Sequence, residues 1–321
     1  MNIKNNYFLN KHLLKHSFQL FIFCFLFITI AQAQNKNGFD LSNSSINSDE
    51  VFSGGPAKDG IPAINTPKFI AAKKVDFLQD NDIVIGFTHK GKARAYPTRI
   101  LIWHEIVNDV FDDLAIAVTY CPLCGTAMVF DRKVKGQLRT FGVSGLLYQS
   151  DVLMYDRETE SLWSQLAMQA VSGEEKGNKL DWLVSEHMSW QAWLEKYPQS
   201  MVLSTDTGYS RNYRSKAYTS YFTSPYTMFP APYTRTELAK KTWVIGIIIN
   251  NKSKAYAVNK FTGNKKITDK LGGKEIIISY DVSSNQPYIT DSKGESVAFV
   301  MVYWFAWQAF YPQSQLWNGA D

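Results

Sequence analysis

Short runs of apolar and β-branched residues alternate with turn-forming residues along most of this chain. Residues 82–88 are apolar and β-branched, Lys90-Gly91 has the composition of a hairpin turn, and residues 92–96 alternate between polar and apolar. This succession predicts a strand, a tight turn and a second strand. Residues 114–120 have the same strand character, so the pattern predicts a chain rich in β-structure.

Between these strands the apolar spacing becomes helical. Pro97 suits a first helical turn, and the residues that then recur at helical spacing are Ile100, Leu101, Trp103, His104 and Val107. The pattern predicts a short helix that connects two strands, with His104 on its inward face.

The strand pattern returns 160 residues later, with identical residues at matching positions. Val84-Ile85-Gly86 matches Val244-Ile245-Gly246, and Ala95-Tyr96 matches Ala255-Tyr256. Each unit therefore reads as strand, turn, strand, connector and strand, and residues 143–190 form an insertion that only the first unit carries. The expected fold class is α+β and β-rich, built from two sequence-related units with an insertion in the first.

The composition of the chain predicts the boundaries of a signal peptide, a leader and two folded units. Residues 1–33 combine lysines, an apolar run and Ala31-Gln32-Ala33, which is the layout of a cleavable signal peptide, so we expect a periplasmic or extracellular protein. Residues 34–52 are polar and predict a flexible leader. The first unit then spans residues 53–235, and the second, degenerate unit spans residues 236–321 and packs on the first.

The charge balance excludes one class of partner. The chain has a formal net charge of +5, and removal of the three lysines of residues 1–33 leaves +2. This is too weak a positive charge for nucleic-acid binding. No later apolar run reaches the length of a membrane span, so we expect none in the mature chain, and the sequence identifies no partner.

Cys121 and Cys124 are the only cysteines outside the predicted signal peptide. They lie in Cys-Pro-Leu-Cys-Gly between two predicted strands, which indicates a hairpin tip rather than the helix N-terminus of a thioredoxin-type motif. Three interpretations remain open at this point: a structural disulfide, a redox dithiol, and part of a metal site.

In the metal interpretation the two sulfurs point to one centre. Zinc needs further ligands and copper(I) prefers soft ones, so His104 and Met128 are candidates. A buried histidine that is hydrogen-bonded to a carbonyl is the alternative role of His104. In the second unit the residues that match Cys121, Cys124, His104 and Met128 are Asp281, Ser284, Asn264 and Tyr288. This difference favours a functional first unit and a second unit that serves as scaffold.

The predicted insertion places polar residues among apolar ones. We expect a pocket wall from Ser150, Asp151, Asp156, Arg157 and Trp163. A hydrolase that uses Ser144, Ser150 or Asp151 is a further hypothesis, but the chain lacks a Gly-x-Ser-x-Gly nucleophile turn around Ser144. Turns whose side chains cap backbone groups are the favoured interpretation of these residues, because Ser, Asp and Gly are common in turns.

Several motifs occur in an order that resembles a known family. They are Gly54-Gly55-Pro56, Lys58-Asp59-Gly60-Ile61-Pro62, Ala95-Tyr96-Pro97, Trp103-His104-Glu105-Ile106-Val107-Asn108-Asp109, Tyr120-Cys121-Pro122-Leu123-Cys124-Gly125-Thr126 and Ser161-Leu162-Trp163. Together they resemble the domain of unknown function 3179 (DUF3179) family of exported prokaryotic proteins. The resemblance implies no activity, but it implies a common site among the His-Glu segment, the cysteine hairpin and the insertion.

Three functions follow from these observations. The leading hypothesis is a thiol-centred site at Cys121 and Cys124 that binds copper or zinc or cycles as a redox dithiol. The second is a non-catalytic scaffold or ligand-binding module with a structural disulfide and an aromatic cleft. The third is the serine-dependent hydrolase, so the sequence leaves open whether the protein is an enzyme.

Overall fold

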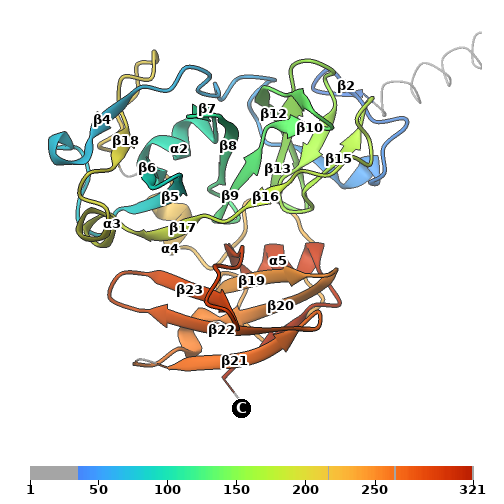
Figure 1. The fold of residues 1–321 in the computed structure, drawn as a ribbon. Helices are drawn as coiled ribbons and strands as arrows, with labels where there is room; N and C mark the ends of the chain where they lie inside the picture. The colour runs from blue at the N-terminus through green and yellow to red at the C-terminus, as the bar shows by residue number, and fades with distance from the viewer. Residues whose placement is uncertain (1–34, 216, 264, 320–321) are drawn as a thin grey trace, which may run out of the picture.

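A computed structural model describes residues 35–215, 217–263 and 265–319. Strands contain 42% of the residues and helices 12%, and the larger sheets form a five-bladed β-propeller. Figure 1 shows the strands from β19 onward gathered on one side of the molecule, with α5 between them and the sheets formed earlier in the chain.

The first two blades come mainly from residues before position 132. In the first, the strand order is β17, β5, β6, β18, β4, with bounds Glu186–Ser189, Ile83–His89, Lys92–Pro97, Met201–Leu203 and Phe69–Ala71. In the second, the order is β16, β9, β8, β7, with bounds Trp182–Leu183, Thr126–Asp131, Leu114–Cys121 and Ile106–Phe111. The edge strands β16 and β17 come from much later in the chain than the hairpins they extend.

The other three blades follow. The third has the order β15, β14, β13, β12, β3, with bounds Gln169–Ser172, Leu162–Ser164, Asp151–Asp156, Phe141–Tyr148 and Val51–Ser53. The fourth has the order β24, β19, β20, β25, with bounds Val300–Tyr303, Trp243–Ile249, Lys252–Ala257 and Gln315–Trp317. The fifth has the order β21, β22, β23, with bounds Lys266–Leu271, Lys274–Asp281 and Gln286–Asp291.

Two hairpins and several short helices complete the described part of the chain. The hairpins pair β1 with β2 and β10 with β11, with bounds Asn35–Lys36, Phe39–Asp40, Lys133–Val134 and Gln137–Leu138. The α-helices are α2, α3, α4 and α5, with bounds Thr98–His104, Trp190–Lys196, Thr219–Thr223 and Trp304–Phe310. The 3-10 helices are η1, η2 and η3, with bounds Ser48–Glu50, Ala72–Lys74 and Val258–Lys260.

The expected fold class is wrong. The protein is a β-propeller rather than an α+β fold, and it does not divide into two units with an insertion in the first. Residues 143–190 supply most of the third blade and also the edge strands of the first and second blades. The backbone hydrogen bonds of three sheets depend on this segment, so it is an integral part of the propeller.

The similarity across 160 residues is a similarity between hairpins of different blades. In the β5–β6 hairpin Val84 pairs with Pro97, and in the β19–β20 hairpin Val244 pairs with Ala257. Gly86 and Gly246 occupy matching positions, where a Cβ atom would lie 2.0 Å and 2.2 Å from a ring atom of Trp193 and Trp307, respectively. The glycines therefore recur because a tryptophan ring packs directly on the backbone.

The structure describes the predicted leader but not the predicted signal peptide. Residues 1–33, the predicted signal peptide, lie outside the described residues. Residues 35–52, predicted to be a flexible leader, are folded against the third blade: Ser45 N donates to Val171 O over 2.7 Å, and β3 pairs with β12. Among the described residues, no helix has both the length and the apolar character needed to cross a membrane.

The main hydrophobic core joins blades that are distant in sequence. It contains buried residues of β8, β9, β12, β13, β19, β24 and α5. Cys121 and Cys124 belong to this core and are 1% and 0% exposed. The cysteines therefore lie inside the molecule, where neighbouring groups rather than water determine their chemistry.

Candidate functional site

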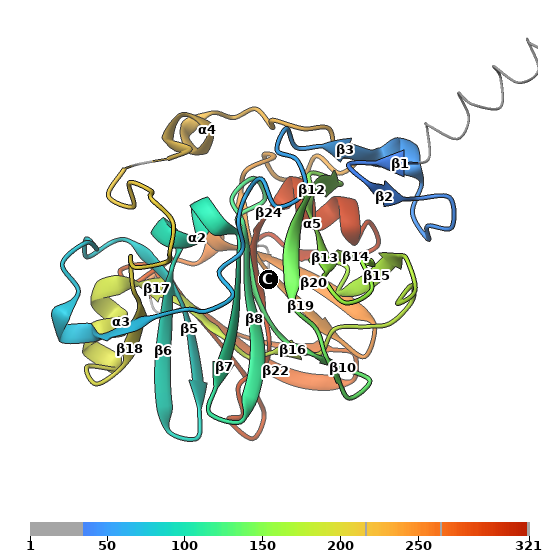
Figure 2. The ribbon, with the colours of Figure 1, turned by 90° about the horizontal axis from the view of Figure 1, so that it is seen from above.

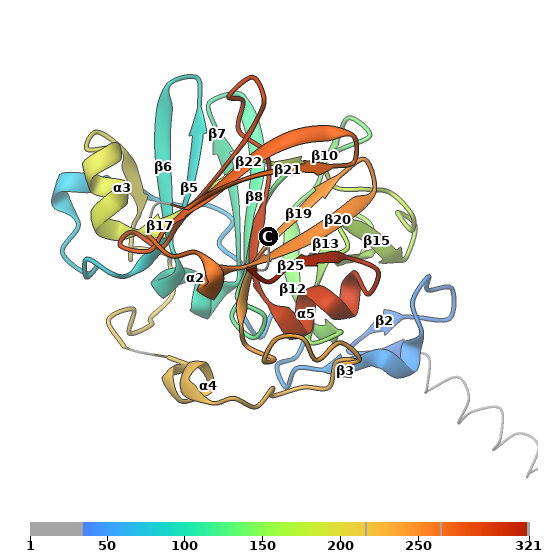
Figure 3. The same ribbon diagram turned by 90° about the horizontal axis from the view of Figure 1, so that it is seen from below.

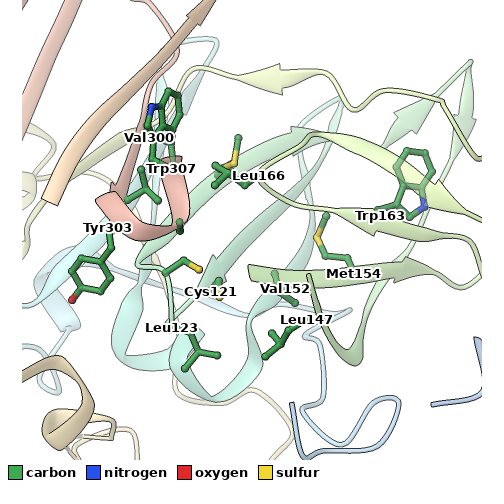
Figure 4. Close-up of a cluster of buried hydrophobic side chains, with 14 of the residues drawn as sticks. Cys121, Leu123, Leu147, Val152, Met154, Trp163, Leu166, Val300, Tyr303 and Trp307 are labelled. Carbon is green, nitrogen blue, oxygen red and sulfur yellow. The ribbon is translucent and has the colours of Figure 1, made fainter. Parts of the chain in front are cut away.

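Two hairpin tips meet around the cysteines. One is the tip between β8 and β9, where Cys121 pairs with Thr126, and the other is the tip between β12 and β13, where Tyr148 pairs with Asp151. Figure 4 shows Cys121 among buried side chains of both hairpins and of the C-terminal segment, including Leu123, Val152 and Trp307.

The cysteine turn does not require its cysteines. The turn between β22 and β23 has the same length and pairing, because Asp281 pairs with Gln286 as Cys121 pairs with Thr126. Gly125 has a φ of +70° and its counterpart, Asn285, has a φ of +54°. Since the same turn forms with Asp281 and Ser284, the two thiols are not needed to make the bend.

The opposing tip is a tight turn with unusual residues. Gln149 and Ser150 have φ values of +52° and +68°, as in a type I′ turn, which normally uses asparagine and glycine. The turn aims the Ser150 carbonyl at the cysteines: Cys124 Sγ donates to Ser150 O over 3.0 Å, and Cys121 Sγ lies 4.0 Å from the same oxygen. An unfavourable backbone conformation that orients a polar group is a common feature of functional sites.

Asp151 completes a group of three metal-ligand side chains. One ligand atom from each of Cys121, Cys124 and Asp151 lies within 4.8 Å of the other two, and all three residues are buried. Thr126 Oγ1 donates to Asp151 Oδ1 over 2.9 Å, and the backbone N of Leu166 donates to Oδ2 over 3.1 Å. These two bonds fix the carboxylate next to the sulfurs.

Burial raises the pKa of each acidic group of the site. The pKa of Cys124 lies well above its ordinary value. Burial is the largest cause, followed by the neighbouring Cys121 and then Asp151. Burial also raises the pKa of Cys121, where the charges of Asp151 and Glu105 add to the effect. Burial raises the pKa of Asp151 to about 6 despite its hydrogen bonds. The site therefore favours protons, or another cation, over free negative charge.

Glu105 is a fourth acidic group beside this cluster, and sequence reasoning missed its role. Its side chain is 8% exposed and lines an apolar cavity of about 60 Å³ with Leu123 and Tyr218. Burial, followed by the charge of Asp151, raises its pKa to about 8. Its carboxyl group has no hydrogen-bond partner among the described residues, and its φ is +57°. The one sequence signal was an acidic residue directly after an inward-facing histidine.

The segment between β18 and β19 and the fourth blade cover the site. Tyr303 N, at the end of β24, donates to Cys124 O over 2.9 Å. Tyr221 of α4 donates through its hydroxyl to Leu123 O over 2.6 Å, and Lys241 Nζ lies over the Tyr221 ring at 3.3 Å from its centroid. Figure 3 shows the segment that carries α4 crossing one side of the molecule.

His104 and Met128, the two expected extra ligands, have different positions. His104 is buried, but its Nδ1 bonds Pro62 O over 2.7 Å and its Nε2 bonds the Tyr213 hydroxyl over 2.6 Å. Both ring nitrogens are thus occupied away from the sulfurs, as in the alternative role considered for this residue. Met128 belongs to the same core cluster as the cysteines.

The expected pocket wall divides into two parts. Ser150 and Asp151 lie beside the cysteines. Asp156 and Trp163 lie at the other end of β13, where Trp163 Nε1 donates to Asp156 Oδ2 over 2.8 Å. Arg157 lies near the surface and pairs with Asp59 over 2.7 Å. The structure therefore does not bring Asp156, Arg157 and Trp163 to the cysteines.

The serines do not form a hydrolase site. Ser144 Oγ donates to Leu153 O and accepts from Leu146 N over 3.0 Å, so both hydrogen-bonding functions serve the backbone. Ser150 Oγ is buried without a partner among the described residues. His104, with both nitrogens occupied, is not available to either serine as a base. Cys121 and Cys124 are free thiols, so the structural disulfide is also not formed.

Comparison with known proteins adds a family but no activity. The model of a family described as "Protein of unknown function (DUF3179)" matches residues 58–302. No curated protein and no solved structure matches the chain.

Proposed function

Because the chain belongs to the DUF3179 family, whose description assigns no activity, we propose a function from the site itself: Cys121, Cys124 and Asp151 bind a zinc ion. The observation that carries the proposal is that their three ligand atoms lie within 4.8 Å of one another in a buried site. Two sulfurs at about 2.3 Å from one zinc ion are at most about 4.6 Å apart. Small side-chain shifts are therefore sufficient for coordination.

The composition of the donor set supports zinc over copper(I). Zinc accepts a mixture of thiolate and carboxylate ligands, whereas copper(I) favours sulfur donors alone. Thr126 and the backbone N of Leu166 already orient the Asp151 carboxylate, and such outer hydrogen bonds support a metal ligand. A cation would also replace the protons that the clustered acidic groups otherwise retain. Three protein ligands leave a fourth position for an exogenous group, as in catalytic zinc sites.

A redox dithiol is the second candidate, because both thiols are free and lie on one turn. The raised pKa values of Cys121 and Cys124 weigh against it. Thiol exchange requires the thiolate as the attacking group. A buried, protonated pair therefore reacts slowly.

The test is metal binding by protein purified under anaerobic, reducing conditions. We expect one zinc ion per chain by mass spectrometry. Cobalt(II) in its place is expected to give the near-ultraviolet absorption of a cobalt–thiolate bond. The Cys121→Ser/Cys124→Ser variant should lose both signals. Asp151→Asn should weaken zinc affinity by more than the roughly 10- to 100-fold effect that outer-sphere partners typically have.

The matched control lies in the equivalent turn between β22 and β23. An Asp281→Asn/Ser284→Ala variant changes the same two turn positions without touching the thiols and should bind zinc normally. Wild-type protein that holds no zinc and gives no cobalt–thiolate absorption would contradict the proposal. Reversible oxidation of the two thiols at a potential well above that of structural disulfides would then support the redox dithiol.

A further inference from the structure

A second cavity lies on the other face of the strand that carries Cys121. Its volume is about 310 Å³, and it is bounded by the loop before β5, the start of α2, the end of β8 and α4. Figure 2 shows α4 facing α2 at this end of the molecule. Tyr120 and Cys121 are consecutive in β8, so their side chains point to opposite faces of the sheet. The cavity is therefore separate from the proposed metal site.

Tyr120 gives the cavity a polar group that lacks a partner. Its side chain lines the cavity and is 7% exposed, and its hydroxyl has no hydrogen bond within the described residues. At the matching position of β22, the Tyr280 hydroxyl donates to Asn285 Oδ1 over 3.1 Å. The Tyr120 hydroxyl opens into the cavity, where a hydroxyl group of a bound molecule can take the place of water as its hydrogen-bond partner.

The charged groups in the wall neutralise each other. Arg99 donates through Nε and an Nη atom to the two carboxylate oxygens of Asp82, each over 2.7 Å. A further Nη–H of Arg99 donates to Arg214 O over 3.0 Å. With this guanidinium already paired, the described residues that line the cavity offer no free positive charge to an anionic ligand.

The rest of the wall combines hydrogen-bonding groups with apolar surface. The side-chain amides of Gln79 and Asn81 lie at the exposed rim and are unpaired among the described residues, and each can both donate and accept. Phe222, which is 36% exposed, and Ile102 supply apolar surface to the same cavity. The complementary ligand has hydroxyl groups along its edges and a C–H face that packs on an aromatic ring.

We propose that this cavity binds a neutral polyol the size of a monosaccharide. Its volume lies at the lower end of the range of about 300–1,000 Å³ that is usual for small-molecule sites. The ligand accepts or donates a hydrogen bond at the Tyr120 hydroxyl, and it reaches Gln79 and Asn81 at the rim. Binding does not require the zinc ion, because the cysteines lie across β8 from the cavity.

The experiment is saturation-transfer NMR on the folded chain with a defined set of probes. The probes are the methyl glycosides of glucose, galactose and mannose, together with mannitol, each at millimolar concentration, with inorganic phosphate and acetate as anionic competitors. We expect saturation transfer to at least one polyol, and no displacement by the anions. Tyr120→Phe, which removes only the hydroxyl, should raise the Kd about 10-fold.

Matched variants test whether the polyol binds in this cavity and through the Tyr120 hydroxyl. Tyr280→Phe removes the equivalent hydroxyl of β22 and should leave binding unchanged. Cys121→Ser/Cys124→Ser should also bind normally, which distinguishes this result from failure of the metal proposal. Asn81→Ala, at an exposed position, provides a second loss-of-binding variant that does not threaten the fold. Absence of saturation transfer to every polyol, equal affinity in Tyr120→Phe, or displacement by phosphate would overturn the proposal.

Discussion

At the scale of single residues, Glu105 is the most informative position. Its carboxyl group is buried beside Asp151 without a described hydrogen-bond partner, and its backbone adopts a φ of +57°. An unpaired buried carboxyl group and a positive φ on a large side chain each destabilise the fold. Their combination at one residue next to the cysteines indicates a role in the site rather than in stability.

The raised pKa of Glu105 predicts a pH-dependent stability for the metal-free protein. Folding favours the protonated carboxyl, because the pKa rises from 4.5 to about 8 in the folded state. The contribution of Glu105 to the unfolding free energy is therefore largest below pH 4.5 and falls as the pH rises to 8, by on the order of 5 kcal/mol at about 1.4 kcal/mol per pKa unit. Urea unfolding at a series of pH values measures this change.

Glu105→Gln keeps the shape of the side chain and removes the titration. We expect its unfolding free energy to vary less across this pH range, with the titration of Asp151, whose pKa is about 6, still present. The exposed control Glu160→Gln should follow the wild type. An unchanged slope in Glu105→Gln would mean that another group titrates.

At the scale of secondary-structure elements, the cysteine turn between β8 and β9 makes a close contact with Trp243 of the fourth blade. Gly125 has a φ of +70°, and a Cβ atom there would lie 2.2 Å from a ring atom of Trp243. Gly91, in the β5–β6 hairpin, has a similar φ of +76° but would meet no atom within 4 Å. The two glycines thus separate the effect of backbone conformation from the effect of packing.

Alanine substitutions at these two glycines should therefore differ. Gly91→Ala is expected to lower the unfolding free energy by about 1 kcal/mol, through backbone conformation alone. Gly125→Ala adds a clash with Trp243 and should lower it by roughly 3 kcal/mol, since overpacking typically adds about 1–3 kcal/mol. Equal losses in chemical unfolding would show that the Trp243 ring moves aside freely.

Sequence patterns predicted individual strands well because their signals are local. The β5–β6 hairpin with its Lys90-Gly91 turn is formed as expected. The helix that was expected to reach Val107 ends instead at His104, and Ile106–Phe111 is strand β7. This boundary was missed because Glu105 adopts a positive φ there without a glycine or proline to indicate it.

The blades could not be predicted in the same way, because they depend on distant pairings. Strand β17 pairs with β5 about 100 residues earlier in the chain, and no local pattern indicates that partner. The cysteine pair was identified from its spacing. The places of Asp151 and Glu105 beside it depend on how two hairpins face each other, which is a tertiary property.

At the scale of the whole molecule, the segment between the first three blades and the last two forms a cover over the cysteines. Tyr221 holds it through its hydrogen bond to Leu123 O, and Lys241 Nζ donates to Tyr221 O. The backbone carbonyl between the two cysteines therefore connects the turn to its cover.

Loss of the Tyr221 hydroxyl should loosen the cover. In Tyr221→Phe we expect faster reaction of Cys121 and Cys124 with a thiol reagent, by roughly 5- to 10-fold for a lost hydrogen bond of about 1 kcal/mol. Tyr226→Phe changes a side chain that is 78% exposed and is the matched control. Identical rates in all three proteins would mean that the reagent reaches the thiols by another route.

The hydrogen bond from Tyr303 N to Cys124 O has a consequence for how the protein can be divided. A fragment that ends before β19 would retain both cysteines and Asp151 but would lose Trp243, Tyr303 and the apolar wall supplied by α5. Its thiols would then be open to air and to other chains, and random intermolecular disulfides would form. The C-terminal quarter therefore protects the chemistry of the N-terminal part, although it contributes none of the three candidate ligands.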